Sequence, residues 1–89
     1  MKIKDGFALR EVAGSWVVLP LSKRLATFNG MITLNESAHL LWKRLELGAT
    51  REELVALLTE EYEVTKEIAT ADVENFLAKI GEAGCISMQ

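Results

Sequence analysis

The stretch FNGMITLNESAHLLW, residues 28–42, predicts a short apolar strand followed at once by a helix, and the rest of the fold can be worked out from it. Asn29-Gly30 is a strong turn pair, and Met31 to Leu34 after it is expected to be a strand. Asn35 has the side chain of a helix N-cap, and Glu36 places an acid in the first helical turn, where the helix dipole favours it. The stretch therefore predicts a strand that runs directly into a capped helix.

Three helices are predicted from this cap onward. The first ends at Gly48, which suits a left-handed stop. The second begins at Thr50, which forms a capping box with Glu53, and the third begins near Thr65 or Lys66 and ends at Gly81 or Gly84. Apolar residues recur at helical spacing in each and give three stripes: Ala38, Leu41, Trp42 and Leu45; Leu54, Leu57, Leu58 and Tyr62; Val73, Phe76, Leu77 and Ile80.

The residues before the turn pair predict a hairpin. FALREVA (7–13) and SWVVLPL (15–21) are rich in strand formers, and Ala13-Gly14-Ser15 between them is a plausible tight turn. Pro20 lacks a backbone donor, so it should close the second strand or lie on an edge. Leu25 to Phe28 has two interpretations: a polar connection, or a further strand that pairs across the Asn29-Gly30 turn.

Strands followed by helices predict an α+β fold with a small antiparallel N-terminal sheet packed on a three-helix bundle. The length of 89 residues indicates a single domain over 1–89, with strands at about 6–34 and helices at about 36–83. The segment CISM, residues 85–88, is expected to be a last extended piece that packs back on the core.

Composition excludes several classes of protein. With 49% hydrophobic and 26% charged residues the chain is neither disordered nor membrane-spanning, and its N-terminus has no signal-peptide pattern. The lone cysteine, Cys85, fits a reducing cytoplasm. Residues 1–49 carry seven Lys/Arg and four Asp/Glu, whereas residues 50–89 carry three and nine. This asymmetry indicates either a partner with its own charge pattern or ordinary solvated helix faces.

Residues suited to catalysis are scarce, so we expect a protein that is not an enzyme and holds no metal or cofactor. His39 lies off the apolar stripe and is expected to face solvent, and Cys85 in its apolar setting is expected to be buried. A winged-helix DNA-binding transcription regulator is the alternative function. It is disfavoured because the second and third helices carry more acids than the Arg and Lys that contact phosphates.

The short strand predicted at Met31 to Leu34 has two interpretations. If Ile32 and Leu34 point to the core, Met31 and Thr33 face outward. The strand is either central and paired on both sides, or an edge strand that lacks the charge or proline with which edges are usually protected. In the second case an extended peptide can add to it by β-augmentation, and two copies of the chain can pair there as a homodimer.

An ordered set of elements resembles the PqqD-like family, the recognition elements for precursor peptides of ribosomally made, modified natural products. The shared pattern has a strand ending in Leu-Asn, an apolar-Trp pair, a Gly-x-Thr turn, a Tyr, and a third helix with Asp-Val-x-x-Phe-Leu before a Gly. It falls here at Leu34-Asn35, Leu41-Trp42, Gly48-Ala49-Thr50, Tyr62, Asp72-Val73, Phe76-Leu77 and Gly84.

The resemblance implies a winged-helix-like fold and a non-catalytic peptide chaperone. Family members bind the leader of a precursor peptide as a strand added beside the third strand, in a cleft against the third helix, and present it to a modifying enzyme, often a radical S-adenosylmethionine enzyme. Carried onto this sequence, the peptide-binding edge is Gly30, Met31, Ile32, Thr33 and Leu34. The opposite wall is one flank of the third helix: Ala69, Asp72, Phe76 and Lys79, rather than the flank of Thr70 and Glu74. A structural subunit that binds an enzyme without touching a peptide is a third possibility.

Overall fold

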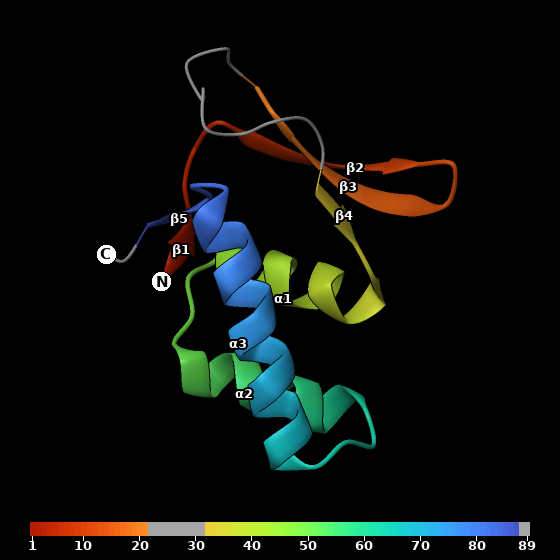
Figure 1. The fold of residues 1–89 in the computed structure, drawn as a ribbon, viewed down its shortest axis with the longest axis vertical. Helices are drawn as coiled ribbons and strands as arrows, with labels where there is room; N and C mark the ends of the chain where they lie inside the picture. Colours follow the sequence, from red (N-terminus) through yellow and green to blue (C-terminus); the bar gives the residue numbers. More distant parts are fainter. Residues whose placement is uncertain (22–31, 88–89) are drawn as a thin grey trace.

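The computed structural model describes residues 1–21 and 32–87 of the chain and shows an α+β fold in which a sheet lies across helices (Figure 1). The predicted α+β class, with three antiparallel strands and three helices, is confirmed. The elements are β1 (Lys2–Ile3), β2 (Phe7–Val12), β3 (Ser15–Pro20), β4 (Ile32–Leu34), α1 (Glu36–Glu46), α2 (Arg51–Glu61), α3 (Lys66–Glu82) and β5 (Ile86–Ser87).

The main sheet has the strand order β2-β3-β4, with both neighbouring pairs antiparallel. The predicted hairpin is present, and Pro20 closes β3 as expected. The turn is one residue shorter than predicted, because Val12 pairs with Ser15 and leaves Ala13-Gly14 as the loop. Both loop residues have positive φ, 52° and 82°, the backbone of the two-residue turns that match strand twist. The alternative pairing of Leu25 to Phe28 lies outside the described residues.

The helices begin at the predicted caps. The side chains of Asn35, Thr50 and Thr65 each accept a hydrogen bond from a backbone N–H of the first turn. Gly48 has a φ of 90° after α1. Helix α3 continues through Gly81 to Glu82, and Gly84, with a φ of 78°, follows its end. These caps satisfy N–H groups that a helix leaves without partners, so local sequence alone sets where each helix starts.

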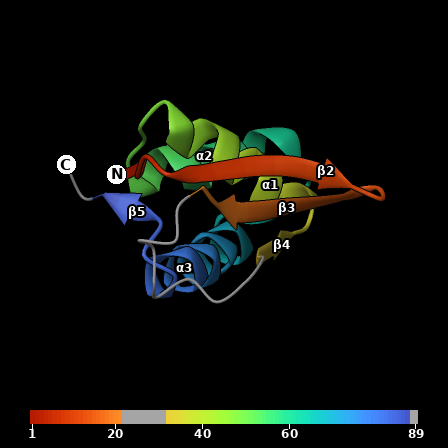
Figure 2. The same ribbon diagram turned by 90° about the horizontal axis from the view of Figure 1, so that it is seen from above.

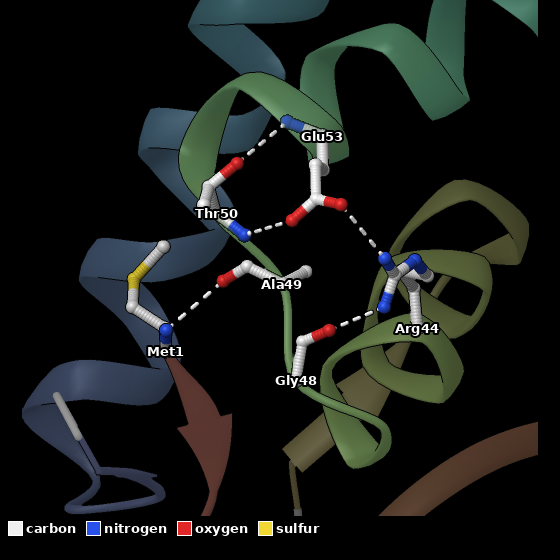
Figure 3. Close-up of polar contacts among 6 residues, drawn as sticks. All are labelled: Met1, Arg44, Gly48, Ala49, Thr50 and Glu53. Atoms are coloured by element: carbon white, nitrogen blue, oxygen red, sulfur yellow. Dashed lines mark hydrogen bonds and ion pairs between the residues drawn. The ribbon is translucent and has the colours of Figure 1, made fainter.

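A network of polar contacts fixes the connection between α1 and α2 (Figure 3). The Thr50 hydroxyl accepts from the Glu53 N–H at 3.1 Å, while the Thr50 N–H donates to the Glu53 carboxylate at 2.8 Å. Arg44 donates to the other Glu53 oxygen at 3.0 Å and to the Gly48 carbonyl. Ala49 exchanges two hydrogen bonds with Met1, so the start of the chain is tied to this connection.

The core lies between the inner face of the sheet and the three helices, with Trp42 of α1 fully buried in it. The stripes of α1 and α3 are buried or half-buried as predicted. In α2 the buried residues are Leu54, Val55 and Leu58, whereas Leu57 and Tyr62 are only partly covered. Val55 joins the core because α2 packs against α1 and α3 at once, which a single stripe does not anticipate.

A second, two-stranded sheet joins the ends of the chain, and the sequence did not predict it. The segment expected to extend at the C-terminus contains β5, and it pairs with β1 through Lys2↔Ser87 and Ile3↔Ile86. Figure 2 shows this pair at the opposite end of the molecule from the β2–β3 turn. Both strands have two residues, too short for a period-2 pattern to be recognised.

Candidate functional site: an open strand edge beside the third helix

A groove of about 1000 Å³ separates β4 from α3 and continues over the first turns of α1. Figure 2 shows β4 at the edge of the sheet that lies on the α3 side. The tip of the β2–β3 hairpin closes one end. The lining residues are Gly14, Ser15, Trp16, Thr33, Leu34, Asn35, Glu36, Ser37, Ala38, His39, Leu41, Asp72, Asn75, Phe76 and Lys79.

The register of the sheet determines which backbone groups of β4 face this groove. The Leu21 N–H donates to the Gly6 carbonyl, and hydrogen-bonded pairs alternate with open pairs in an antiparallel ladder. It follows that Val17 turns its N–H and C=O toward β2. Its partner Thr33 is thus in an open pair and directs both backbone groups away from β3. Of the two possibilities left by the sequence, the described residues show β4 as an edge strand.

Lys79 connects the two walls of the groove. Its ammonium group donates to the Thr33 carbonyl at 3.2 Å, although 46 positions separate the two residues in the chain. This contact agrees with the register, because the accepting oxygen must point away from β3 to meet a side chain of α3. It also places a positive charge at the middle of the strand edge.

Trp16 and His39 form the wall nearest the hairpin. Their rings are stacked, with centroids 3.8 Å apart and planes at 6°. The prediction that His39 faces solvent is wrong, since the side chain is half-buried against this indole. It was missed because Trp16 of β3 covers the first turn of α1, a contact between residues far apart in the chain.

The predicted site residues fall into three groups. Thr33, Leu34, Asp72, Phe76 and Lys79 line the groove. Ile32 lies in β4 opposite Val18 and packs against the core, and Ala69 is fully buried in the core. Gly30 and Met31 lie outside the described residues.

The placement of Ala69 corrects one part of the predicted helix wall. Ala69 shares a flank with Asp72, but it is fully buried in the core together with Val73, and α3 packs against α2. Asn75 lines the groove and was missed. The sequence could have indicated it, because Asn75 lies three residues after Asp72 and four before Lys79, and residues at these spacings share a helix face.

A smaller hollow of about 320 Å³ continues from the groove past the start of α1. Asn35, Glu36, Ser37 and Asp72 belong to both hollows, and Leu58, Tyr62 and Val64 add an apolar floor. Burial raises the pKa of Tyr62, and the carboxylates of Glu36 and Glu61 add to the effect. The acids Glu36 and Asp72 thus lie at this end of the groove, and Lys79 lies at the level of Thr33.

Reactive groups outside the groove are few in the described part of the chain. Cys85 is buried as predicted, and burial raises the pKa of its thiol to about 11, so it remains a protonated, unreactive thiol. Over residues 1–21 and 32–87 there is no group of three or more His, Cys, Asp or Glu placed to hold a metal ion. None of the helices in these ranges is long and apolar enough to cross a membrane.

Two solved structures share the fold. "TbiB1 in Complex with the TbiA(beta) Leader Peptide" superposes with a TM-score of 0.79 at 24% sequence identity, over 100% of this chain and 98% of that chain. "Lasso peptide synthetase B1 complexed with the leader peptide" gives 0.75 at 23% identity, over 94% and 93%.

No curated protein matches the sequence. The profile of the family "Coenzyme PQQ synthesis protein D (PqqD)" matches residues 15–86, from the start of β3 into β5. This match covers most of the chain and includes β3, β4, α1 and α3, which line the groove, so the protein belongs to the PqqD family.

Proposed function

We propose that this protein binds the leader of a ribosomally made precursor peptide, which adds to the sheet as a strand beside β4. The observation that carries the proposal is the orientation of Thr33, whose N–H and C=O face a groove and no other strand of residues 1–21 and 32–87. Backbone bonding to such an edge gives affinity, and the groove gives specificity through the peptide side chains. Leu34, Phe76 and Asp72 supply apolar and acidic contacts within it.

The two structural neighbours support this proposal, because both are complexes with a leader peptide. Their identities to this chain, 24% and 23%, establish a common fold, so the peptide role is carried over as part of the proposal. The peptide-binding edge would extend from Thr33 to Gly30 and Met31. Ala69, buried beneath the wall, would support Asp72 and Phe76 from behind.

In this proposal the protein is a non-catalytic chaperone in natural product biosynthesis. It would act as a single cytoplasmic domain that presents the bound leader to a modifying enzyme, a radical S-adenosylmethionine enzyme in the first instance. A homodimer formed through β4 would compete with the peptide for the same edge. The alternative of a winged-helix DNA-binding regulator gains no support from the family or from the neighbours, and the exposed face of α3 carries Glu67, Asp72 and Glu74.

A titration monitored by NMR tests the proposal. The ¹⁵N-labelled protein is titrated with two probes: the TbiA(β) leader, and the leader of any short precursor peptide encoded beside this gene. We expect shifts at Ile32–Leu34 and at Asp72, Asn75 and Phe76. Shifts confined to other surfaces, or the absence of binding by both probes, would contradict the proposal. Duplex DNA serves as the probe for the alternative function.

Thr33→Pro tests the backbone contact directly. Proline removes the N–H that faces the groove and leaves the ladder to β3 intact, so the fold should survive. Loss of one backbone hydrogen bond, worth about 0.5–1.5 kcal/mol, should weaken leader binding about 2- to 10-fold.

Glu11→Pro is the matched control for this variant. Glu11 pairs with Trp16, and the same alternation turns its N–H outward at the opposite edge of the sheet, on β2. Circular dichroism should show both variants folded, and only Thr33→Pro should lose affinity. Equal binding by the two variants would show that the peptide does not pair with β4.

A further inference from the structure

The two edges of the main sheet are protected differently. Edge strands commonly carry charged side chains that discourage unwanted pairing. Strand β2 has Arg10 and Glu11, whereas Ile32, Thr33 and Leu34 of β4 have no charge. The charge at the β4 edge comes instead from α3, through the hydrogen bond from the Lys79 ammonium to the Thr33 carbonyl.

This hydrogen bond occupies the group that strand addition requires. A peptide strand beside β4 places its own N–H on the Thr33 oxygen, in the bond that Lys79 makes in the free protein. Both the lysine side chain and Thr33 are exposed, so the ammonium can leave the oxygen without being buried. An ammonium has three donors and no acceptor, and its preferred new partner in the groove is an anionic oxygen.

The distribution of charge along the groove indicates where that anion belongs. Glu36 and Asp72 lie at the end formed by the start of α1, and they repel an acidic side chain there. Lys79 is the one Lys or Arg among the lining residues that the structure describes. An acidic side chain of a bound peptide therefore has a favourable position beside Thr33 and an unfavourable one toward Asp72.

We propose that Lys79 protects the β4 edge reversibly. It releases the Thr33 carbonyl to a peptide N–H and then pairs with an acidic side chain of that peptide. The inference rests on the proposed function and adds the peptide class: leaders with Asp or Glu beside the residue that pairs with Thr33. Lys79 acts here as a specificity residue. A leader without the acid still adds to the edge, but it leaves the displaced ammonium to water.

A cycle of binding measurements on protein and peptide variants tests this role of Lys79. The probes are the leader encoded beside this gene and the same peptide with each Asp and Glu replaced by Asn and Gln, measured by calorimetry. The wild type should prefer the acidic form by about 1.5- to 5-fold, the range of an exposed ion pair. Lys79→Met should lose that preference and bind the amidated form at least as tightly as the wild type does. Lys79→Arg should restore the preference.

Lys66→Met is the control for net charge, because Lys66 is an exposed lysine of α3 outside the groove lining. It should change the preference for the acidic form less than Lys79→Met does. Equal changes in the two variants would overturn the role of Lys79 while the proposed function stands. A wild type that binds neither peptide would overturn both.

The free protein supplies a second readout. The ¹⁵N shift of the Leu34 amide reports on hydrogen bonding to the adjoining Thr33 carbonyl. Lys79→Met should move this resonance and Lys66→Met should leave it in place. A Leu34 resonance that is the same in all three proteins would show that the Lys79 ammonium does not bond to the Thr33 carbonyl. It would overturn the proposed protection of the β4 edge by Lys79.

Discussion

Ala13 is the one non-glycine residue with a positive φ among residues 1–21 and 32–87. Its value of 52° lies in the left-handed region, where the Cβ atom approaches the following carbonyl at a cost of about 1–2 kcal/mol. The turn requires this backbone because Gly14 follows at 82° and the strands pair on both sides. The hairpin therefore keeps a strained residue at a position where Asn-Gly is the preferred pair.

Ala13→Asn should relieve part of this strain. We expect a gain of up to about 1 kcal/mol in the free energy of unfolding, or roughly 4–8 °C in Tm for a domain of this size. Ala71→Asn, at an exposed position in α3, is the control and should lose about 0.5 kcal/mol because asparagine is a poorer helix former. Thermal melts compare the two, and a destabilised Ala13→Asn would contradict the turn assignment.

The start of α2 shows how one element depends on pH. The Thr50 backbone N–H donates to the Glu53 carboxylate and lowers the pKa of Glu53; the Thr50 hydroxyl and the Arg44 charge act in the same direction. A carboxylate with a lower pKa in the folded protein stabilises the fold above its unfolded pKa. That contribution is lost as the pH falls through the folded pKa.

Glu53→Gln should therefore be less stable than the wild type at neutral pH. The difference in the free energy of unfolding should shrink as the pH is lowered to about 3, measured by denaturant titration across that range. Glu60→Gln removes the same charge from an exposed position of the same helix, away from the cap, and serves as the control. A difference between wild type and Glu53→Gln that stays constant with pH would contradict the role of the ionised carboxylate.

The elements that sequence predicted well are those with local causes. The Asn35, Thr50 and Thr65 caps bond to N–H groups three residues away, so a short window contains both partners. Contacts between distant residues were missed for the opposite reason. The stack of His39 on Trp16 does not follow from the periodicity of one helix. The burial of Ala69 could have been predicted from it, because Ala69 lies four residues before Val73 and seven before Phe76 on the same face. Asp72, Phe76 and Lys79 of the predicted α3 flank line the groove, whereas Ala69 is buried. Their part in peptide binding stays a prediction.

In the molecule as a whole, residues 1–4, which include β1, join two distant parts of the chain. The Lys4 N–H donates to the Cys85 carbonyl at 2.8 Å, and Met1 exchanges two hydrogen bonds with Ala49. The N-terminal strand thus lies between the end of α3 and the connection from α1 to α2. Ile3 and Ile86 pack beside the same core.

Lys4→Pro should weaken the attachment of the N-terminal strand to the end of α3. It removes the donor to Cys85 and should lower the free energy of unfolding by about 1 kcal/mol, read as Tm in a thermal melt. Lys4→Ala keeps the N–H and should stay within about 0.5 kcal/mol of the wild type, since the side chain is exposed. Equal melting of the two variants would show that the β1–β5 pair adds no stability. Leader binding should be unchanged in both, because neither strand lines the groove.

The alternation that turns Thr33 outward would also affect how long the proposed leader stays bound. Within β4 only this residue offers its N–H and C=O, and two backbone hydrogen bonds are worth about 1–3 kcal/mol together. A micromolar complex needs about 8 kcal/mol, so side chains in the groove must supply the rest. A micromolar complex that forms at about 10⁵–10⁷ M⁻¹s⁻¹ dissociates within about 0.1–10 s, and changes in the peptide alter mainly this dissociation rate. For the proposed chaperone, a short residence time is an advantage, because a leader that dissociates quickly is easily transferred to the modifying enzyme.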